Sequence, residues 1–553
     1  MGDFEPVFSR RGAMAASVLA GAGLALPASS ASAQVTHPRG GGDTPCTTPH
    51  SAIARTRFGP VRGYISGDVL TFKGVPYGAD TGGANRWLPA KEPSPWTEPL
   101  STLSYGPNCP QSMHDMRNSE HTFIQQWTDG FVGEDMLKLN IWTPSLSGNR
   151  PVMVYFHGGG FSFGSSYELA SHDGAQMARN HDVVQVSINH RLNVLGFLDL
   201  RHVGGAAYED SVNCSMMDCI AALRWVRENI ANFGGDPDKV MIYGQSGGGS
   251  KVTTMLGMPA GRGLIHRASI QSGGGGNQPP LEMSQEFSRR VLASLNISRI
   301  EDLQRASWQT LFDAGNRVAL EMNGPQVVRL GFMNGPPRVG WWPTVDGKNI
   351  TMASFHDGAP EISKDIPILV GSVTEEGTAL RSNPTEAQWR ETLAGQFGAP
   401  KADALMAAMK AANPNKSIRT LSYAVGGYGQ RNAVQNMVRM KYEQQAAPVY
   451  QWWFTWQSPV LDGQAGAWHT AELAFCFDNA KLCEQGTGNT PEAQALARKM
   501  STAWANFART GNPSQPGLEW TPTDPVNVQT MVFDDTCGMV NDPHAEVRRV
   551  LLG

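Results

Sequence analysis

The sequence predicts an α/β fold in which a mostly parallel β-sheet is flanked by helices within one large domain. Short apolar runs alternate along the chain with segments of helical character, and no internal repeat interrupts this pattern. Apolar residues recur at helical spacing over 218–233, and Gly234-Gly235 then ends the predicted helix. The predicted strands are Val152–Phe156, Val183–Asn189, Val240–Tyr243, Ala268–Gln271, Ile366–Gly371 and Val449–Trp456.

The first 33 residues are typical of an export signal that is removed from the mature protein. Arg10-Arg11 precedes an apolar Gly/Ala-rich region, and Ala31-Ser32-Ala33 offers a cleavage site before Gln34. The paired arginines favour a twin-arginine signal, with an ordinary Sec signal or a retained anchor as alternatives. We therefore expect an exported protein, periplasmic or secreted, with a flexible N-terminal lead-in over 34–51 and the folded domain over 52–553.

The composition excludes several classes of partner. The 553-residue chain is 41% hydrophobic, has a formal net charge of −4 and contains no polybasic block, so we expect a large core and no nucleic-acid partner. After residue 33 no apolar run reaches the roughly 18 residues that span a bilayer, so no stable membrane insertion is expected. The oligomeric state is not indicated by the sequence.

Seven cysteines are too few and too irregularly spaced for a disulfide scaffold or a zinc framework. Cys214 and Cys219 are near enough in sequence to form a bridge, and so are Cys476 and Cys483. Free buried thiols are the alternative. Because the count is odd, at least one cysteine has no partner within the chain.

The stretch Gly244-Gln245-Ser246-Gly247-Gly248 lies between a predicted strand and a segment that can be helical. This is the context of a nucleophile elbow, a turn so tight that residues two before and two after the serine have little room for a Cβ. The elbow exposes the Ser246 Oγ and points the Gly247 N–H toward any oxyanion formed there. A plain glycine-rich connection is the alternative for this stretch taken alone.

A second glycine-rich loop, His157-Gly158-Gly159-Gly160, follows the first predicted strand directly. Consecutive glycines let backbone N–H groups face a ligand that side chains would otherwise block. Gly159 and Gly160, together with Gly247, supply up to three donors to a tetrahedral intermediate.

A general base and its acidic partner are expected further along the chain. Glu375 and Glu376 follow a late predicted strand, where either carboxylate can reach an imidazole, and their spacing alone does not choose between them. His469 comes after the aromatic strand that ends near Trp456, on a loop long enough to return over the sheet. The resulting chain order, Ser246 then an acid then His469, is the order of Ser-His-acid hydrolases with a nucleophile elbow.

The chain as a whole resembles the type-B carboxylesterases, the cholinesterase-like and para-nitrobenzyl-esterase-like branch of the α/β-hydrolases, in a bacterial exported form. The resemblance runs from about residue 52 to 550 and is made of many separate motifs in the same order. These motifs include 72–77 (FKGVPY), 134–140 (EDMLKLN), 189–197 (NHRLNVLGF), 229–237 (NIANFGGDP), 271–273 (QSG), 343–347 (PTVDG) and 504–513 (WANFARTGNP).

The resemblance implies an α/β-hydrolase fold and a serine carboxylic-ester hydrolase that needs no metal and no cofactor. It implies that Glu376 rather than Glu375 is the triad acid beside Ser246 and His469. It also implies that Gly159, Gly160 and Gly247 are the oxyanion donors. A small-molecule ester is the expected substrate.

Two departures from the family pattern bear on function. Gln245 stands where the family commonly has glutamate, so a buried negative charge beside the serine is missing and a neutral or anionic ester is favoured over a cationic one. Met136 replaces a cysteine, so Cys109 lacks the disulfide partner that the resemblance implies.

Two other functions use the same sequence features. A non-catalytic cholinesterase-like binding protein shares the fold, although such proteins typically lack a triad member. An amidase, a lipase or an acyltransferase uses the same triad, because the acyl-enzyme chemistry is shared.

Overall fold

A computed structural model describes residues 45–552 of the chain except 48–49, 113–118, 277, 325–336 and 378–382. The described residues belong to one compact unit, Asp43–Gly553. The predicted export signal, residues 1–33, and most of the predicted lead-in, residues 34–51, lie outside the described residues.

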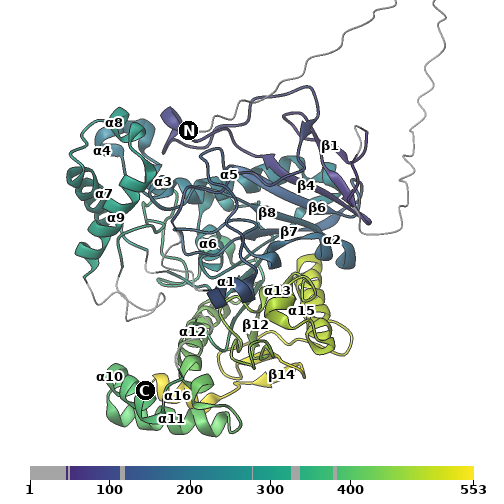
Figure 1. Cartoon of the computed structure of the whole chain (residues 1–553), viewed down its shortest axis with the longest axis vertical. Helices are drawn as coiled ribbons and strands as arrows, with labels where there is room; N and C mark the ends of the chain where they lie inside the picture. Colours follow the sequence, from purple (N-terminus) through teal and green to yellow (C-terminus); the bar gives the residue numbers. More distant parts are fainter. Residues whose placement is uncertain are drawn as a thin grey trace, which may run out of the picture. The chain divides into compact units, whose positions relative to one another are not determined.

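An eleven-stranded sheet runs through this unit, and its central strands are parallel (Figure 1). In spatial order the parallel strands are β8 (Val184–Ile188), β7 (Arg150–Phe156), β9 (Gly235–Gln245), β10 (Arg267–Gln271), β11 (Ile368–Val373), β12 (Val449–Phe454) and β13 (Gln529–Phe533). The predicted mostly parallel sheet is confirmed, and each of the six predicted strands overlaps one of these.

Antiparallel strands extend the sheet at both edges. They are β6 (Lys138–Thr143), β4 (Val69–Pro76) and β3 (Tyr64–Ser66) at one edge and β14 (Gly538–Asn541) at the other. A separate three-stranded sheet contains β1 (Ile53–Arg55), β2 (Pro60–Arg62) and β5 (Leu100–Ser101). The sequence prediction lacks these strands, because several are only two to four residues long and carry no continuous apolar run.

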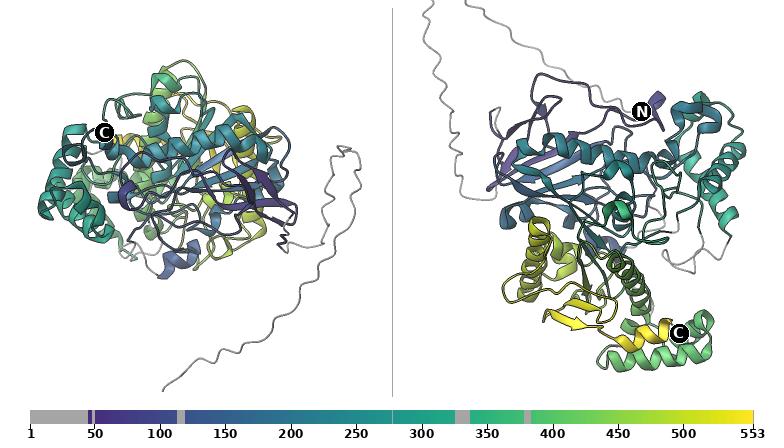
Figure 2. Two further views of the ribbon diagram at one scale, coloured as in Figure 1. Left: turned by 90° about the horizontal axis from the view of Figure 1, so that it is seen from above. Right: turned by 180° about the vertical axis from the view of Figure 1, so that it is seen from behind.

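Both faces of the central sheet are covered by helices (Figures 1 and 2). Alternate residues of β7 point to opposite faces: Val152, Val154 and Phe156 lie in one hydrophobic core, whereas Met153 and Tyr155 lie in another. Because neither face meets water, the central strands can be apolar throughout. The first core includes α5 (Cys214–Asn229) and α6 (Gly247–Leu256), and the second includes α2 (Ala175–His181), α13 (Leu473–Cys476) and α15 (Pro491–Thr510).

The helix predicted over 218–233 is observed in two parts. The α-helix α5 begins at Cys214, and after Asn229 a 3-10 turn continues over Ile230–Phe233. Gly234 ends that turn with a φ of 76°, a left-handed conformation that costs glycine little. The predicted end is confirmed and the predicted start is wrong, because the first turn, 214–217, contains the buried polar residue Ser215, which interrupts the apolar periodicity.

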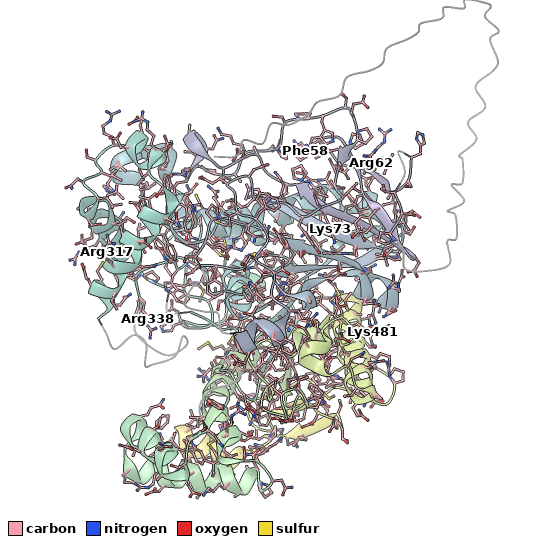
Figure 3. The ribbon with its side chains drawn as sticks, viewed as in Figure 1. Phe58, Arg62, Lys73, Arg317, Arg338 and Lys481 are labelled. Carbon is pink, nitrogen blue, oxygen red and sulfur yellow. The ribbon has the colours of Figure 1, made fainter. Side chains whose placement is uncertain are left out.

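Further helices, for which the sequence analysis makes no prediction, pack outside the sheet. One group packs on the first core, and Arg317 projects from the exposed face of its helix α9 (Figure 3). That group contains α7 (Leu281–Ser294) and α9 (Trp308–Asn323). The other group is α10 (Glu386–Phe397), α11 (Ala399–Ala412), α12 (Ile418–Glu443) and α16 (Ala545–Leu552), which share a smaller core. The remaining short helices are α1 (Ser119–Gln125), α3 (Asn193–Gly196), α4 (Arg201–Gly204), α8 (Ile300–Arg305) and α14 (Glu484–Thr487).

All seven cysteines are free in the structure, so neither of the two bridges considered from sequence spacing forms. Cys109 is buried, its Sγ accepts a hydrogen bond from the Leu192 N–H at 3.2 Å, and burial raises the pKa of its thiol. In the described ranges, no helix combines the length and apolar character required to cross a bilayer.

Candidate active site

Ser246 occupies a strained turn between β9 and α6. Its φ of 58° and ψ of −123° lie outside the regions that L-residues ordinarily adopt, as a nucleophile elbow requires. The turn leaves no space for side chains beside it: a Cβ on Gly244 would lie 2.5 Å from the Gly248 carbonyl carbon, and one on Gly248 would lie 1.9 Å from the Phe156 oxygen. The Ser246 N–H donates to the Gln271 carbonyl at 2.8 Å, which ties the elbow to β10.

The glycine loop that follows β7 lies against this elbow. β7 and β9 are adjacent parallel strands with Phe156 paired to Gly244, so the segments that leave their carboxyl ends emerge side by side. Gly159 and Gly160 have φ values of 80° and 64°, which orient their peptides in a way that other residues rarely adopt. The two segments touch, because a Cβ on Gly247 would lie 2.1 Å from the Gly160 oxygen.

The N–H groups of Gly159, Gly160 and Gly247 donate no hydrogen bond to any group in the described part of the chain. Gly247 is buried and Gly159 and Gly160 are half-buried, so all three donors are left available to an acceptor from outside the protein, either water or a bound ligand. The structure thus brings together the three glycines that the sequence analysis selected.

His469 and Glu376 reach the same end of the sheet from adjacent parallel strands. Glu376 follows β11 and His469 follows β12, and the Nδ1–H of the imidazole donates to Glu376 Oε2. The other oxygen of that carboxylate accepts the Val373 N–H at 3.2 Å, which fixes its orientation. Burial acts to lower the pKa of His469, but the neighbouring Glu376 carboxylate outweighs it and the pKa is raised.

The adjacent Glu375 points away from the imidazole. Its N–H donates to the Ala467 carbonyl at 3.1 Å, and its Oε2 lies over Gly466, where a Cβ would approach it to 2.1 Å. Burial raises the pKa of this carboxyl, and its Oε1 has no hydrogen-bond partner within the described ranges. Of the two glutamates that the spacing leaves open, only Glu376 contacts His469.

The His469 ring lies beside Gln245, the residue that precedes the serine. The Gln245 side-chain nitrogen is 3.4 Å from Nδ1 and 3.3 Å from Nε2 of the ring. The two ring nitrogens are separated by Cε1, which blocks an approach to both of them within the ring plane. The Gln245 nitrogen, nearly equidistant from both, therefore lies over the face of the ring, and neither contact is a linear hydrogen bond. No hydrogen bond joins Ser246 Oγ to the ring among the described residues.

Two buried charged groups near the site are absent from the sequence prediction. Glu472, three positions after His469, is fully buried, and burial raises the pKa of its carboxyl to about 7. Lys251, on the helix that follows Ser246, is fully buried as well. A signal was present for the second, because Lys251 is the one charged residue in the helix Gly247–Leu256.

The tryptophans that flank the site mostly fill the core. Trp452, Trp453 and Trp468 are buried in the described structure. Trp342 instead packs edge to face on Phe161, the residue after the glycine loop, with their ring centres 5.5 Å apart. Within the described ranges, no group of three or more His, Cys, Asp or Glu side chains is arranged to hold a metal ion.

The chain as a whole matches known proteins. A model of the carboxylesterase family matches residues 50–547 of the chain. The chain belongs to the carboxylesterase family. It is therefore an enzyme, a carboxylesterase, and the resemblance noted from the sequence motifs is confirmed.

Individual relatives support the same conclusion. The chain is 30% identical to the para-nitrobenzyl esterase of Bacillus subtilis (strain 168), over 90% of this chain and 98% of that protein. It is 31% identical to the phenmedipham hydrolase of Pseudarthrobacter oxydans, over 90% of this chain and 97% of that one.

Solved structures show the shared α/β-hydrolase fold. An esterase from the anaerobe Clostridium hathewayi, described as able to hydrolyse aliphatic aromatic polyesters, superposes with a TM-score of 0.79 at 32% identity, covering 92% of this chain and 99% of that one. A para-nitrobenzyl esterase structure superposes with a TM-score of 0.71 at 28% identity, covering 90% and 99%.

Proposed function

We propose that this carboxylesterase hydrolyses its ester through a Ser246–His469–Glu376 triad and an acyl-enzyme intermediate. The observation that carries the proposal is the hydrogen bond between His469 and Glu376 at an imidazole that lies beside the strained Ser246 turn. A base held by a carboxylate next to an exposed hydroxyl is the arrangement that activates a serine.

The reaction begins when His469 Nε2 takes the proton of Ser246 as its Oγ attacks the ester carbonyl carbon. The ring must move from its stacked position on Gln245 to do so, which is consistent with catalytic hydrogen bonds that form fully only when substrate is bound. His469 then gives the proton to the leaving alcohol. A water molecule attacks the acyl-enzyme by the reverse sequence and releases the acid.

Glu376 holds the imidazole in the tautomer that keeps Nε2 free to accept the proton, and it stabilises the ring when it becomes cationic. The N–H groups of Gly159, Gly160 and Gly247 bind the oxyanion that forms on the carbonyl oxygen. Their lack of any other acceptor in the described structure supports this role.

We propose that the preferred ester is neutral or anionic. Gln245 places an uncharged amide against the imidazole, at the position where a carboxylate would attract a cationic alcohol. The relatives are named for different substrates, and their names do not select one for this chain.

The decisive experiment uses the mature protein with a chromogenic short-chain ester and a fluorescent organophosphonate. The native enzyme should hydrolyse the ester and be labelled at Ser246, and the Ser246→Ala variant should fold normally, take no label and lose turnover by several orders of magnitude. Substantial turnover by that variant would rule out Ser246 as the nucleophile. Labelling without turnover of any ester would favour a binding protein, and faster cleavage of a matched anilide would favour an amidase.

Residues 1–33 are proposed to direct export and to be removed. The mature protein recovered from the cell envelope or medium should then begin at Gln34, which N-terminal sequencing measures.

A further inference from the structure

A lysine with no acidic partner is buried in contact with the glycine loop. Lys251 lies on α6, the helix that starts immediately after Ser246, and its side chain is fully buried. No carboxylate of the described residues lies within ion-pair distance of its ammonium. A buried, unpaired cation is costly, so its retention calls for a physical reason.

The ammonium binds the backbone of the glycine loop. Lys251 Nζ donates to the His157 carbonyl at 2.8 Å and to the Gly158 carbonyl at 3.4 Å, and it lies 5.4 Å from the centre of the Phe161 ring. These contacts span both ends of the segment that contains Gly159 and Gly160. The ammonium therefore ties that segment to helix α6.

One of these carbonyls belongs to an oxyanion donor. The Gly158 carbonyl and the Gly159 N–H are the two ends of a single planar peptide group. A positive charge on the carbonyl end polarises the peptide and makes the N–H at its other end a stronger donor. The Gly158 oxygen also lies 3.0 Å from His157 Nδ1, so both available donors hold this peptide in one orientation.

We propose that Lys251 is a positioning residue for the oxyanion hole: its buried ammonium orients the His157–Gly159 segment and strengthens the Gly159 N–H as a donor to the tetrahedral intermediate. The inference rests on the proposed serine mechanism. It adds a charged group that does not touch the substrate and acts only through the peptide backbone.

The surrounding titratable groups leave Lys251 as the positive charge of this region. His157 and His190 stack with their ring centres 5.0 Å apart, and burial, together with the Lys251 charge, holds the pKa of each well below its usual value. Burial lowers the pKa of Lys251 to about 8, and the neighbouring Cys219 and Glu168 act in the opposite direction. The imidazoles are therefore neutral where the lysine is charged.

The test replaces Lys251 by methionine, which keeps an unbranched side chain, one heavy atom shorter, and removes the charge. The matched control is Lys441→Met, because Lys441 is also buried and also donates to two backbone carbonyls, those of Ser363 and Lys364, but contacts no residue of the site. Steady-state kinetics on a chromogenic ester, and affinity for a trifluoromethyl ketone that forms an oxyanion on Ser246, are measured for both.

The Lys251→Met variant should lose on the order of tenfold or more in kcat and in kcat/KM, with KM nearly unchanged, and its affinity for the trifluoromethyl ketone should fall in parallel. The Lys441→Met variant should keep native values of all three. A native kcat in Lys251→Met, a rise in KM alone, or equal losses in the control would overturn the proposal.

If Lys251→Met does not fold, Lys251→Gln decides the question, since it keeps a hydrogen-bond donor near the end of the side chain but carries no charge. Its kcat should lie below the native value, and a native kcat would overturn the role of the charge. Failure of the serine mechanism is recognised separately, because Ser246→Ala would then retain turnover whatever Lys251 does.

Discussion

The two sides of the active site are built in different ways. On the serine side, Ser246, Gly247 and the 157–160 loop are fixed by backbone packing, with glycine wherever a Cβ would collide. On the acid–base side, Glu376 and His469 sit on loops after β11 and β12 and are fixed by a charged hydrogen bond between side chains. The difference teaches that replacing a glycine on the serine side should affect folding, whereas a substitution on the acid–base side should affect turnover and its pH dependence.

The sharpest test of the acid–base side compares its two neighbouring glutamates. Glu376→Gln should lower kcat by about 10³–10⁴-fold, because the amide no longer enforces the imidazole tautomer or stabilises its cation. Glu375→Gln, the matched control, should lower kcat by less than about tenfold, since Glu375 does not contact His469. Steady-state kinetics measures both. Equal losses would mean that the hydrogen bond in the structure does not identify the acid.

The backbone packing of the serine side predicts an effect on stability. Gly248→Ala should lower the free energy of unfolding by about 2–3 kcal/mol, because its Cβ would lie 1.9 Å from the Phe156 oxygen and the elbow would have to shift. The matched control Gly395→Ala, in helix α10 with no atom within 4 Å of the new Cβ, should leave stability unchanged or raise it by up to about 1 kcal/mol. Urea denaturation followed by circular dichroism measures both, and equal stability of the two variants would contradict the steric argument.

Gln245 lies at the junction of the two sides and bears on the charge of the substrate. Gln245→Glu should lower kcat/KM for an anionic ester relative to a neutral ester of the same shape by about tenfold, because a carboxylate then faces the substrate. The exposed Gln396→Glu, on helix α10, carries the same change in net charge and should leave that ratio unchanged. An unchanged ratio in Gln245→Glu would remove the reason to propose a neutral or anionic ester.

The smallest expected effect is on the pH dependence of kcat/KM and concerns the acid–base side. His469 acts as a base only when neutral, and its raised pKa means that activity is lost as pH falls through a value above the ordinary histidine pKa of about 6.5. Glu472 contributes to that raised pKa, so Glu472→Gln should move the acid limb of kcat/KM to lower pH by less than about one unit. The exposed Glu484→Gln is the control, and a pH–rate profile measures both. An acid limb that stays in place in Glu472→Gln would show that its charge does not reach the imidazole.

Much of the serine side could be predicted from sequence because its determinants are local. Gly244 and Gly248 meet the steric requirement of the turn within the five-residue motif centred on Ser246, and the glycines at 158–160 do the same for the facing loop. The central parallel strands were recognisable for a similar reason, since burial on both faces leaves continuous apolar runs. The edge strands and the outer helices have no comparable local signal.

The sequence alone determined the family and the central sheet, and it predicted Ser246, His469 and the three glycines as site residues. The residue spacing left Glu375 and Glu376 open and the family resemblance favoured Glu376, but only the tertiary structure shows that Glu376 is the one hydrogen-bonded to His469. Only the tertiary structure, too, places Gln245 against the imidazole and Lys251 against the glycine loop. The physical reason is range: steric limits on a tight turn act between residues adjacent in the chain, whereas a charge acts on whatever folding brings within a few ångströms of it. Glu376 and His469 are 93 residues apart in sequence, and their contact exists only once β11 and β12 lie side by side.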